Sequence, residues 1–146
     1  MKTKEPPQAV ELEKDVLGAL MVESKSIDKI PFLTPEMFYD TKNRLIFESI
    51  LDLNNEGNPI DIHTVSEQLK KNGTLEKVGG LYTLAELTAV CSASHIVYHA
   101  EIINQKFISR QLITLSTEIA EKSFDETNDV SDVLSELEKR FTEIVI

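Results

Sequence analysis

The chain has 146 residues, of which 41% are hydrophobic and 27% charged, and its formal net charge is −10. This length and composition fit one globular domain, or a small domain with an appendage, and exclude a disordered chain. The charge disfavours nucleic-acid binding, because such a surface repels phosphate backbones and no basic patch is set apart in the sequence. The sequence has no long apolar run and no signal peptide, and its single cysteine, Cys91, excludes an internal disulfide, so it predicts a cytoplasmic protein with no membrane partner.

The first half of the chain predicts short helices. Apolar residues recur at intervals of three and four, and no segment alternates Val, Ile and Thr as a strand would, so the fold class is all-α. A first helix follows Pro6 and Pro7, and Gly18 within it predicts a close neighbouring helix, since Gly otherwise costs a helix about 1 kcal/mol. One face of this helix holds Ala9, Leu12, Val16 and Leu20.

Two further helices lie between proline and glycine signals. After the connector "IPFLTPEMF", which has room for one helical turn, residues 41–55 form a helix that ends before Gly57. The next helix is capped by Asp61 or Thr64, with Thr64 and Glu67 matching a capping box, and it ends at Gly73. The turn "EKVGG" then precedes a short helix, whose inner face is predicted to hold Leu81, Leu84 and Leu87 or Thr88.

The second half predicts a hairpin of two longer helices. From about Ser94 the chain runs for about thirty residues without Gly or Pro, and after "DETND" a second helix begins near Ser131. Apolar residues of this second helix follow a heptad rhythm: Val130, Leu134, Leu137, Phe141 and Ile144. The sequence therefore predicts a disordered tail over residues 1–7, a globular body over 8–92 and a helical hairpin over 93–146.

The motifs that could carry chemistry are weak. Gly79 and Gly80 lack the GxxxxGK[ST] pattern and follow no strand, and the helix pair around Gly73 resembles a DNA-reading pair in outline only, because "LYTLAELTAV" contains no Arg, Lys, Asn or Gln. Cys91, His95 and His99 are spaced for one helical face and a metal, but "VCSAS" predicts a loop that takes the cysteine off the helix. The sequence therefore predicts no catalytic, cofactor or metal site.

The long helix carries more apolar residues than one partner helix can cover. At about 100° per residue its apolar positions fall on three stripes. The main stripe holds Val97, Ile108, Leu112, Leu115 and Ile119; a second holds Ile102, Ile113 and Ala120; a third holds Ile96, Ile103 and Phe107. The body and the second hairpin helix can each cover one stripe. Ile113 is therefore predicted to contact another chain.

Several blocks of the sequence resemble a known family in order and spacing. The blocks "PPQAVELEKDVLGALM", "EMFYDTKNRLIFESILDL" and "GNPIDIHTVSEQLKKNGTLEKVGGLYTLAEL", followed by the hairpin, resemble the N-terminal domain of the bacterial replicative DNA helicase DnaB family from Pro6 to Ile146. The resemblance implies a helical body with a hairpin that pairs between subunits, and a six-membered collar on which primase and, in some bacteria, a helicase loader dock. It also implies that the motor domain, which binds ATP and Mg²⁺, is absent after residue 146.

The resemblance also assigns roles to individual residues. Thr83, Ile113 and Ile119 correspond to the surface that binds the primase C-terminal domain. Independently of the resemblance, the hairpin helices carry more apolar surface than one intramolecular contact can bury, so we expect Leu137 and Phe141 to take part in self-association, as a dimer or a hexameric ring of dimers. Two alternatives stay open. One is the helicase-binding domain of a primase, which resembles this fold, and the other is a small DNA-binding helical regulator, which would need a basic face.

Overall fold

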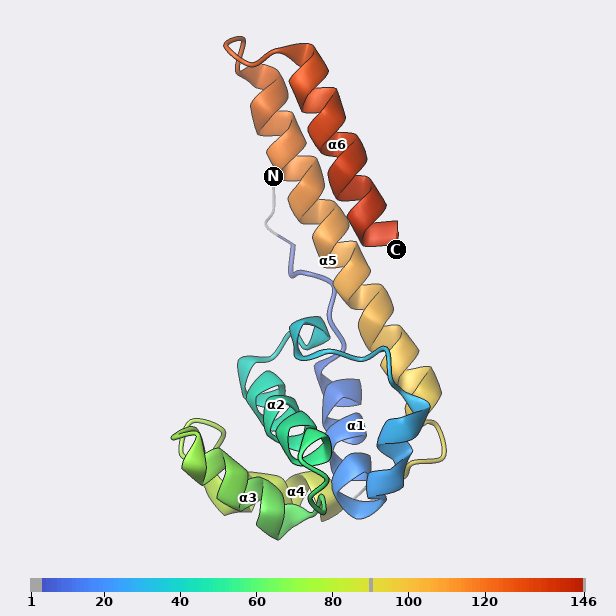
Figure 1. Cartoon of the computed structure of the whole chain (residues 1–146), viewed down its shortest axis with the longest axis vertical. Coiled ribbons are helices and arrows are strands. Elements are labelled where there is room, and N and C mark those ends of the chain that lie inside the picture. Colours follow the sequence, from blue (N-terminus) through green and yellow to red (C-terminus); the bar gives the residue numbers. More distant parts are fainter. Residues whose placement is uncertain (1–3, 90, 146) are drawn as a thin grey trace. The chain divides into compact units, whose positions relative to one another are not determined.

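The computed structural model describes residues 4–89 and 91–145 of the chain, and these residues form helices and turns without a β-strand (Figure 1). The all-α prediction is confirmed. The elements in chain order are α1 (Val10–Val22), the 3₁₀ turns η1 (Ser24–Lys29) and η2 (Pro35–Met37), α2 (Thr41–Asn55), α3 (Ile62–Lys71), α4 (Gly80–Ala89), α5 (Ile96–Phe124) and α6 (Val130–Val145). In the described part of the chain, no helix is long and apolar enough to cross a lipid bilayer.

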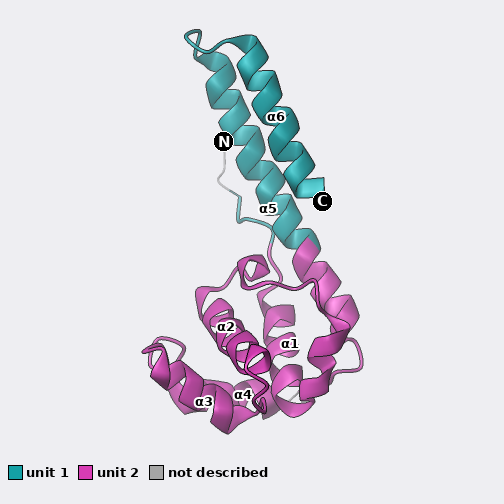
Figure 2. Cartoon of the chain, in the orientation of Figure 1, with its two compact units in different colours: residues 1–7, 105–146 teal, residues 8–104 magenta. Residues whose placement is uncertain are grey.

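The chain forms two compact units, which Figure 2 colours separately. We call residues 8–104 the body, and the second unit, with residues up to Pro7 and from Gln105 onward, the hairpin unit. The division falls inside α5, whereas the sequence pattern placed the boundary before this helix. The reason is that the first turns of α5 are buried in the core of the body through Ile96, Ala100 and Ile103.

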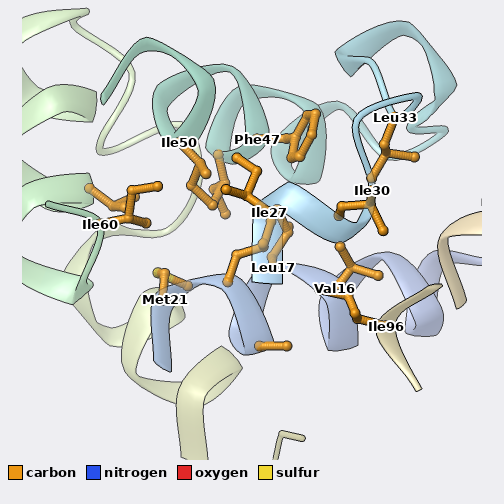
Figure 3. Close-up of a cluster of buried hydrophobic side chains, with 14 of the residues drawn as sticks. Val16, Leu17, Met21, Ile27, Ile30, Leu33, Phe47, Ile50, Ile60 and Ile96 are labelled. Carbon is orange, nitrogen blue, oxygen red and sulfur yellow. The ribbon is translucent and has the colours of Figure 1, made fainter. Parts of the chain in front are cut away.

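The core of the body is built from short helices that each bury one apolar face (Figure 3). The rings of Phe38 and Phe47 stack with their centroids 4.7 Å apart, which ties the connector before α2 to that helix. Other core side chains come from α1, η1 and the residue that follows it, α2 and the start of α5, and they include Val16, Leu17, Met21, Ile27, Ile30, Ile50 and Ile96.

Gly18 lies where α1 and α4 pack closely against each other. A Cβ atom added at Gly18 would stand 2.0 Å from the backbone oxygen of Leu87 in α4. No real Cβ atom tolerates that distance, so only glycine permits this approach of the two helices. The predicted close packing against Gly18 is confirmed.

Two local predictions need correction. The N-cap of α3 is Asp61, whose carboxylate accepts from the Thr64 amide at 2.9 Å while the Thr64 hydroxyl accepts from the Asp61 amide at 2.9 Å. The predicted capping box of Thr64 with Glu67 is therefore wrong. The helix begins at Ile62, so the capping box lies about one turn earlier and joins Asp61 to Thr64. In α4, Leu84 is buried and Leu87 half-buried, but Leu81 is exposed, since α4 turns its Leu84 face to α1 and α3.

Candidate functional site

The Gly79–Gly80 pair serves as a turn between α3 and α4. The Gly79 amide donates to the Glu76 carbonyl at 3.1 Å, and the Gly80 amide donates to the Leu75 carbonyl at 2.9 Å. Both glycines have positive φ, 103° and 72°, a backbone conformation that other residues rarely adopt. Because both amides are already hydrogen-bonded to the preceding turn, they do not form a phosphate cradle.

Cys91 lies in the loop between α4 and α5, as the "VCSAS" pattern predicts. Its thiol donates to the Thr88 carbonyl at 3.6 Å, and burial, with the nearby Asp15 and Glu23 carboxylates, raises its pKa. A raised pKa keeps the thiol protonated and so makes it a poor nucleophile or metal ligand. His95 and His99 have ring centroids 6.2 Å apart, and no group of three metal-binding side chains occurs within residues 4–89 and 91–145.

Thr83 lines a groove on the body between α1, the start of α2 and α4, which we call the body groove. Its volume is about 530 Å³. Val78 is buried beneath it, while Val10 and Leu87 contribute half-buried apolar surface. The polar side chains that line it are Glu11, Lys14, Asp15, Asp40, Lys42, Asn43, Thr83 and Glu86.

Carboxylates outnumber cations in the body groove. Glu11 and Lys14 pair with each other at 3.3 Å. That pairing leaves Asp15, Asp40 and Glu86 facing one remaining cation, Lys42. Asp40 also accepts a hydrogen bond from the Asn43 amide at 3.0 Å. The groove therefore has a negative potential over a partly apolar floor.

In the hairpin unit, ion pairs fix the alignment of α5 with α6. Lys122 pairs with Glu136, and Arg140 pairs with Glu118. The hydrogen bond from Lys122 is the main cause that lowers the pKa of Glu136, and the hydrogen bond to Glu118 raises the pKa of Arg140. On the same helices Leu115 is buried, whereas Ile113 is 53% exposed, as its position off the main stripe predicts.

A second groove lies between α5 and α6 near the turn that joins them, and we call it the hairpin groove. Its volume is about 490 Å³, and it brings together Ile119 of α5 and Leu137 of α6. Both side chains are half-buried, while Phe141 further along α6 is exposed. The other apolar walls of the groove are Val130, Val133 and Leu134.

The sequence did not predict that the residues lining either groove come together. The body groove joins segments more than seventy positions apart, such as Glu11 and Glu86, and nothing in the sequence pairs them. The heptad rhythm of α6 gave a partial signal for the hairpin groove. It did not show that Ile119 and Leu137 share one surface.

Comparison with known proteins gives a consistent result. The family model described as DnaB-like helicase N terminal domain matches residues 5–105. The replicative DNA helicase DnaB of Rhodothermus marinus is 41% identical over 135 residues, which are 91% of this chain and 14% of that protein. The replicative DNA helicase DnaC of Bacillus subtilis is 36% identical over 141 residues, 95% of this chain and 31% of that protein. The chain thus spans about a third or less of these relatives.

Solved structures agree with the sequence relatives. The N-terminal domain of DnaB helicase from Mycobacterium tuberculosis superposes with a TM-score of 0.88 at 29% identity, covering 95% of this chain and 99% of that one. A DnaB-like replicative helicase, studied together with its interactions with primase, superposes with a TM-score of 0.74 at 27% identity, covering 91% of this chain and 31% of that one.

Proposed function

Since the chain belongs to the DnaB-like helicase N-terminal domain family, we propose that it is the non-catalytic assembly and docking domain of a replicative DNA helicase. The observation that carries this proposal is the match along 95% of the chain to a solved DnaB N-terminal domain, of which 99% is covered. The parent protein would be an ATP-dependent helicase of the cytoplasm. We propose that ATP and Mg²⁺ bind other regions of it. In support, the Gly79–Gly80 amides of this domain are hydrogen-bonded to their own turn.

We propose two kinds of partner for this domain. One is a protein of the replication machinery, the primase C-terminal domain, supported by the similar helicase that was studied with primase. A helicase loader is a further partner that the family resemblance implies. The other kind of partner is the chain itself, as a dimer or a hexameric ring of dimers, through the α6 residues Leu137 and Phe141.

On the body, the docking surface that we propose centres on Thr83. Three carboxylates face one unpaired lysine in the body groove, over a floor that includes Val78 and Leu87. A lysine or arginine side chain fits such a surface, because its aliphatic stem packs on the apolar floor while its charge meets the carboxylates. We therefore expect the segment of primase that contacts Thr83 to be basic.

On the hairpin unit, the docking residue that we propose is Ile113. Its side chain on α5 is more than half exposed, and the pairing of α5 with α6 does not cover it. An exposed isoleucine of this kind suits the centre of a protein interface.

The test is the Ile113→Ala variant of the full-length helicase, with primase affinity measured by calorimetry. Truncation of an interface anchor costs more than about 1 kcal/mol, so we expect affinity for the primase C-terminal domain to fall at least about five-fold. Val145→Ala, another exposed apolar position, is the matched control and should bind as the wild type does. Wild-type affinity of Ile113→Ala would reject this docking surface, and loss of the hexamer would assign Ile113 to the subunit interface.

The comparisons disfavour the helicase-binding domain of a primase, since the relatives that match are replicative helicases. Sequencing the parent gene beyond residue 146 distinguishes the two. We expect a RecA-like domain with a GxxxxGK[ST] loop, and a stop codon directly after residue 146 would contradict the proposal.

A further inference from the structure

The residues before α1 lie along α5 in the hairpin unit. Residues 4–7, which we call the strap, adopt neither helix nor strand, and Figure 2 shows them beside α5 in the colour of the hairpin unit. The contact that joins them is a hydrogen bond of 2.8 Å from Nη1 of Arg110 to the carbonyl oxygen of Pro7. Because α1 begins three residues later, at Val10, a helix entry does not explain why the strap lies beside α5.

Arg110 is positioned to hold the strap. Its guanidinium carbon lies 5.8 Å from the centre of the Phe107 ring, one turn earlier in α5, while its Nη1 donates to Pro7. The arginine, the phenylalanine and Pro7 are all half-buried, and partial exclusion of water strengthens a charged hydrogen bond. The Pro7 carbonyl needs such a donor, because a segment outside helices and sheets has no regular hydrogen-bonding pattern to supply one.

The two prolines lower the cost of ordering the strap. Proline fixes one backbone dihedral angle, so the segment around Pro6 and Pro7 is stiff before it contacts α5. A stiff segment loses less conformational entropy on ordering than a flexible one does. The hydrogen bond from Arg110 therefore holds this strap more firmly than it would hold a segment rich in glycine.

Arg110 lies in a stretch of α5 without a fully buried side chain. Ile103 is the last residue of α5 that is buried in the body, and Leu115 is the next buried residue along the helix. Between them, residues 104–114 are half-buried or exposed. Glu118, which pairs with α6, is about two turns beyond Arg110. Since most of the stability of a helix comes from tertiary packing, the strap contacts α5 where core packing supports it least.

We propose that the strap stabilises the helical conformation of residues 105–112 of α5, and that Arg110 is the residue that holds it there. Ile113 is the next turn of the same helix, so the strap also keeps this docking residue in its binding geometry before primase is bound. Such preorganisation raises affinity, because less ordering is left to the binding step. Arg110 is thus a positioning residue for docking. Its role in primase binding rests on the proposed function, whereas the stabilisation of α5 does not.

The first experiment measures amide hydrogen exchange of the 146-residue chain by nuclear magnetic resonance. A solved N-terminal domain, of which 99% is covered by this chain, shows that such a domain folds on its own. Arg110→Met keeps an aliphatic stem but loses the donor. We expect the amides of residues 107–112 to exchange at least about five-fold faster in this variant, while those of residues 118–122 should exchange as in the wild type.

A chain without residues 1–7 tests whether Arg110 acts through the strap. The amides of residues 107–112 in this chain should exchange as fast as they do in Arg110→Met. Adding Arg110→Met to the shortened chain should give no further acceleration, because the two changes remove the same interaction. Wild-type exchange in either single change, or further acceleration in the combined variant, would overturn the inference.

Arg44→Met is the matched control for the loss of an arginine. It removes a comparable hydrogen bond within the body, from Nη2 of Arg44 to the Phe38 carbonyl at 3.2 Å. Exchange of residues 107–112 should stay within about two-fold of the wild type in this variant, since local opening of α5 does not involve that bond. Acceleration equal to that of Arg110→Met would show a general loss of stability and overturn the inference.

The second experiment measures affinity of the full-length helicase for the primase C-terminal domain by calorimetry. We expect Arg110→Met and the deletion of residues 1–7 to lower the affinity by the same factor, about three-fold, because both release the strap. Unchanged affinity, or a larger loss in Arg110→Met than in the deletion, would overturn the positioning role of Arg110. Wild-type affinity of Ile113→Ala would instead reject the docking surface itself, and the exchange experiment still decides whether the strap stabilises α5.

Discussion

Glu13 is a buried carboxylate on the apolar side of α1. It is 1% exposed, and its two oxygens accept from the Tyr39 amide at 2.8 Å, the Asp40 amide at 3.3 Å and the Asn43 side-chain amide at 3.1 Å. These donors stand at the start of α2, where the helix dipole favours a negative charge. The hydrogen bonds of Glu13 therefore hold the connector and α2 against α1, and they compensate for the free-energy cost of burying this polar side chain.

Replacing Glu13 tests this role. In Glu13→Gln an NH₂ group replaces one of the two accepting oxygens, so a donor faces a donor and a buried hydrogen bond is lost. We therefore expect the free energy of unfolding to fall by about 1–3 kcal/mol. Urea denaturation followed by circular dichroism measures the change. Glu11→Gln, two positions before Glu13 and on the exposed side of α1, should change it by less than about 0.5 kcal/mol. Equal effects of the two variants would contradict the role of Glu13.

At the scale of elements, the packing of α1 against α4 depends on Gly18. In Gly18→Ala the added Cβ atom meets the Leu87 carbonyl oxygen at 2.0 Å. The oxygen belongs to one helix backbone and the Cβ is bonded directly to the other, so neither atom can rotate away. We expect a net loss of about 2 kcal/mol, since a clash this close places the cost of overpacking at the upper end of about 1–3 kcal/mol and the gain in helix propensity is only about 1 kcal/mol.

A second glycine serves as the control for Gly18. Gly73 has a φ of +74° and nothing within 4 Å of an added Cβ, so Gly73→Ala should cost only the backbone strain of about 1 kcal/mol. Thermal melts of both variants give the comparison. A Gly18→Ala chain as stable as the wild type would show that α1 and α4 are not packed as closely as described.

The α5–α6 hairpin should lose stability in acid. The Lys122 ammonium lowers the pKa of Glu136 below its ordinary value of 4.5. A lowered pKa means that the ion pair contributes its full stability above that ordinary value, and that the contribution is lost as the pH falls through the lowered pKa. We expect Glu136→Gln to lower the melting temperature at pH 7, with a difference from the wild type that shrinks below about pH 4.5.

Glu138→Gln controls for the loss of a carboxylate from α6. Glu138 is exposed on the same helix, so its variant should match the wild type at every pH. Melting temperatures followed by circular dichroism between pH 3 and 7 measure both variants. A Glu136→Gln difference that stays constant over this range would show that charge pairing does not cause it.

At the scale of the whole molecule, the charge balance predicts the response to DNA. The chain has 15 basic and 25 acidic residues, and the body groove is itself negative. We expect no binding to single-stranded or duplex oligonucleotides at about 0.15 M salt, because DNA affinity depends on release of counterions by clustered basic residues. Fluorescence anisotropy measures this binding. Binding below micromolar concentration that weakens steeply with salt would reveal a basic surface.

The sequence alone determined which segments are helices and where several of them end. Proline, Asp61 and the glycines are local signals, and the predicted helix over residues 41–55 agrees with α2. It also determined that a helix approaches Gly18 and that Ile113 is exposed. These properties depend on neighbours within a few positions, or on how many apolar stripes a single helix carries.

Only the tertiary structure decided which apolar face of each helix packs against which other helix. Periodicity placed Leu81 on the inner face of α4, but α4 packs through Leu84 and leaves Leu81 exposed. The body groove and the meeting of Ile119 with Leu137 depend on how loops return the chain to itself. Many chain paths are compatible with the same helix pattern. The contacts between distant residues are set by the close packing of all helices together, which no single segment encodes.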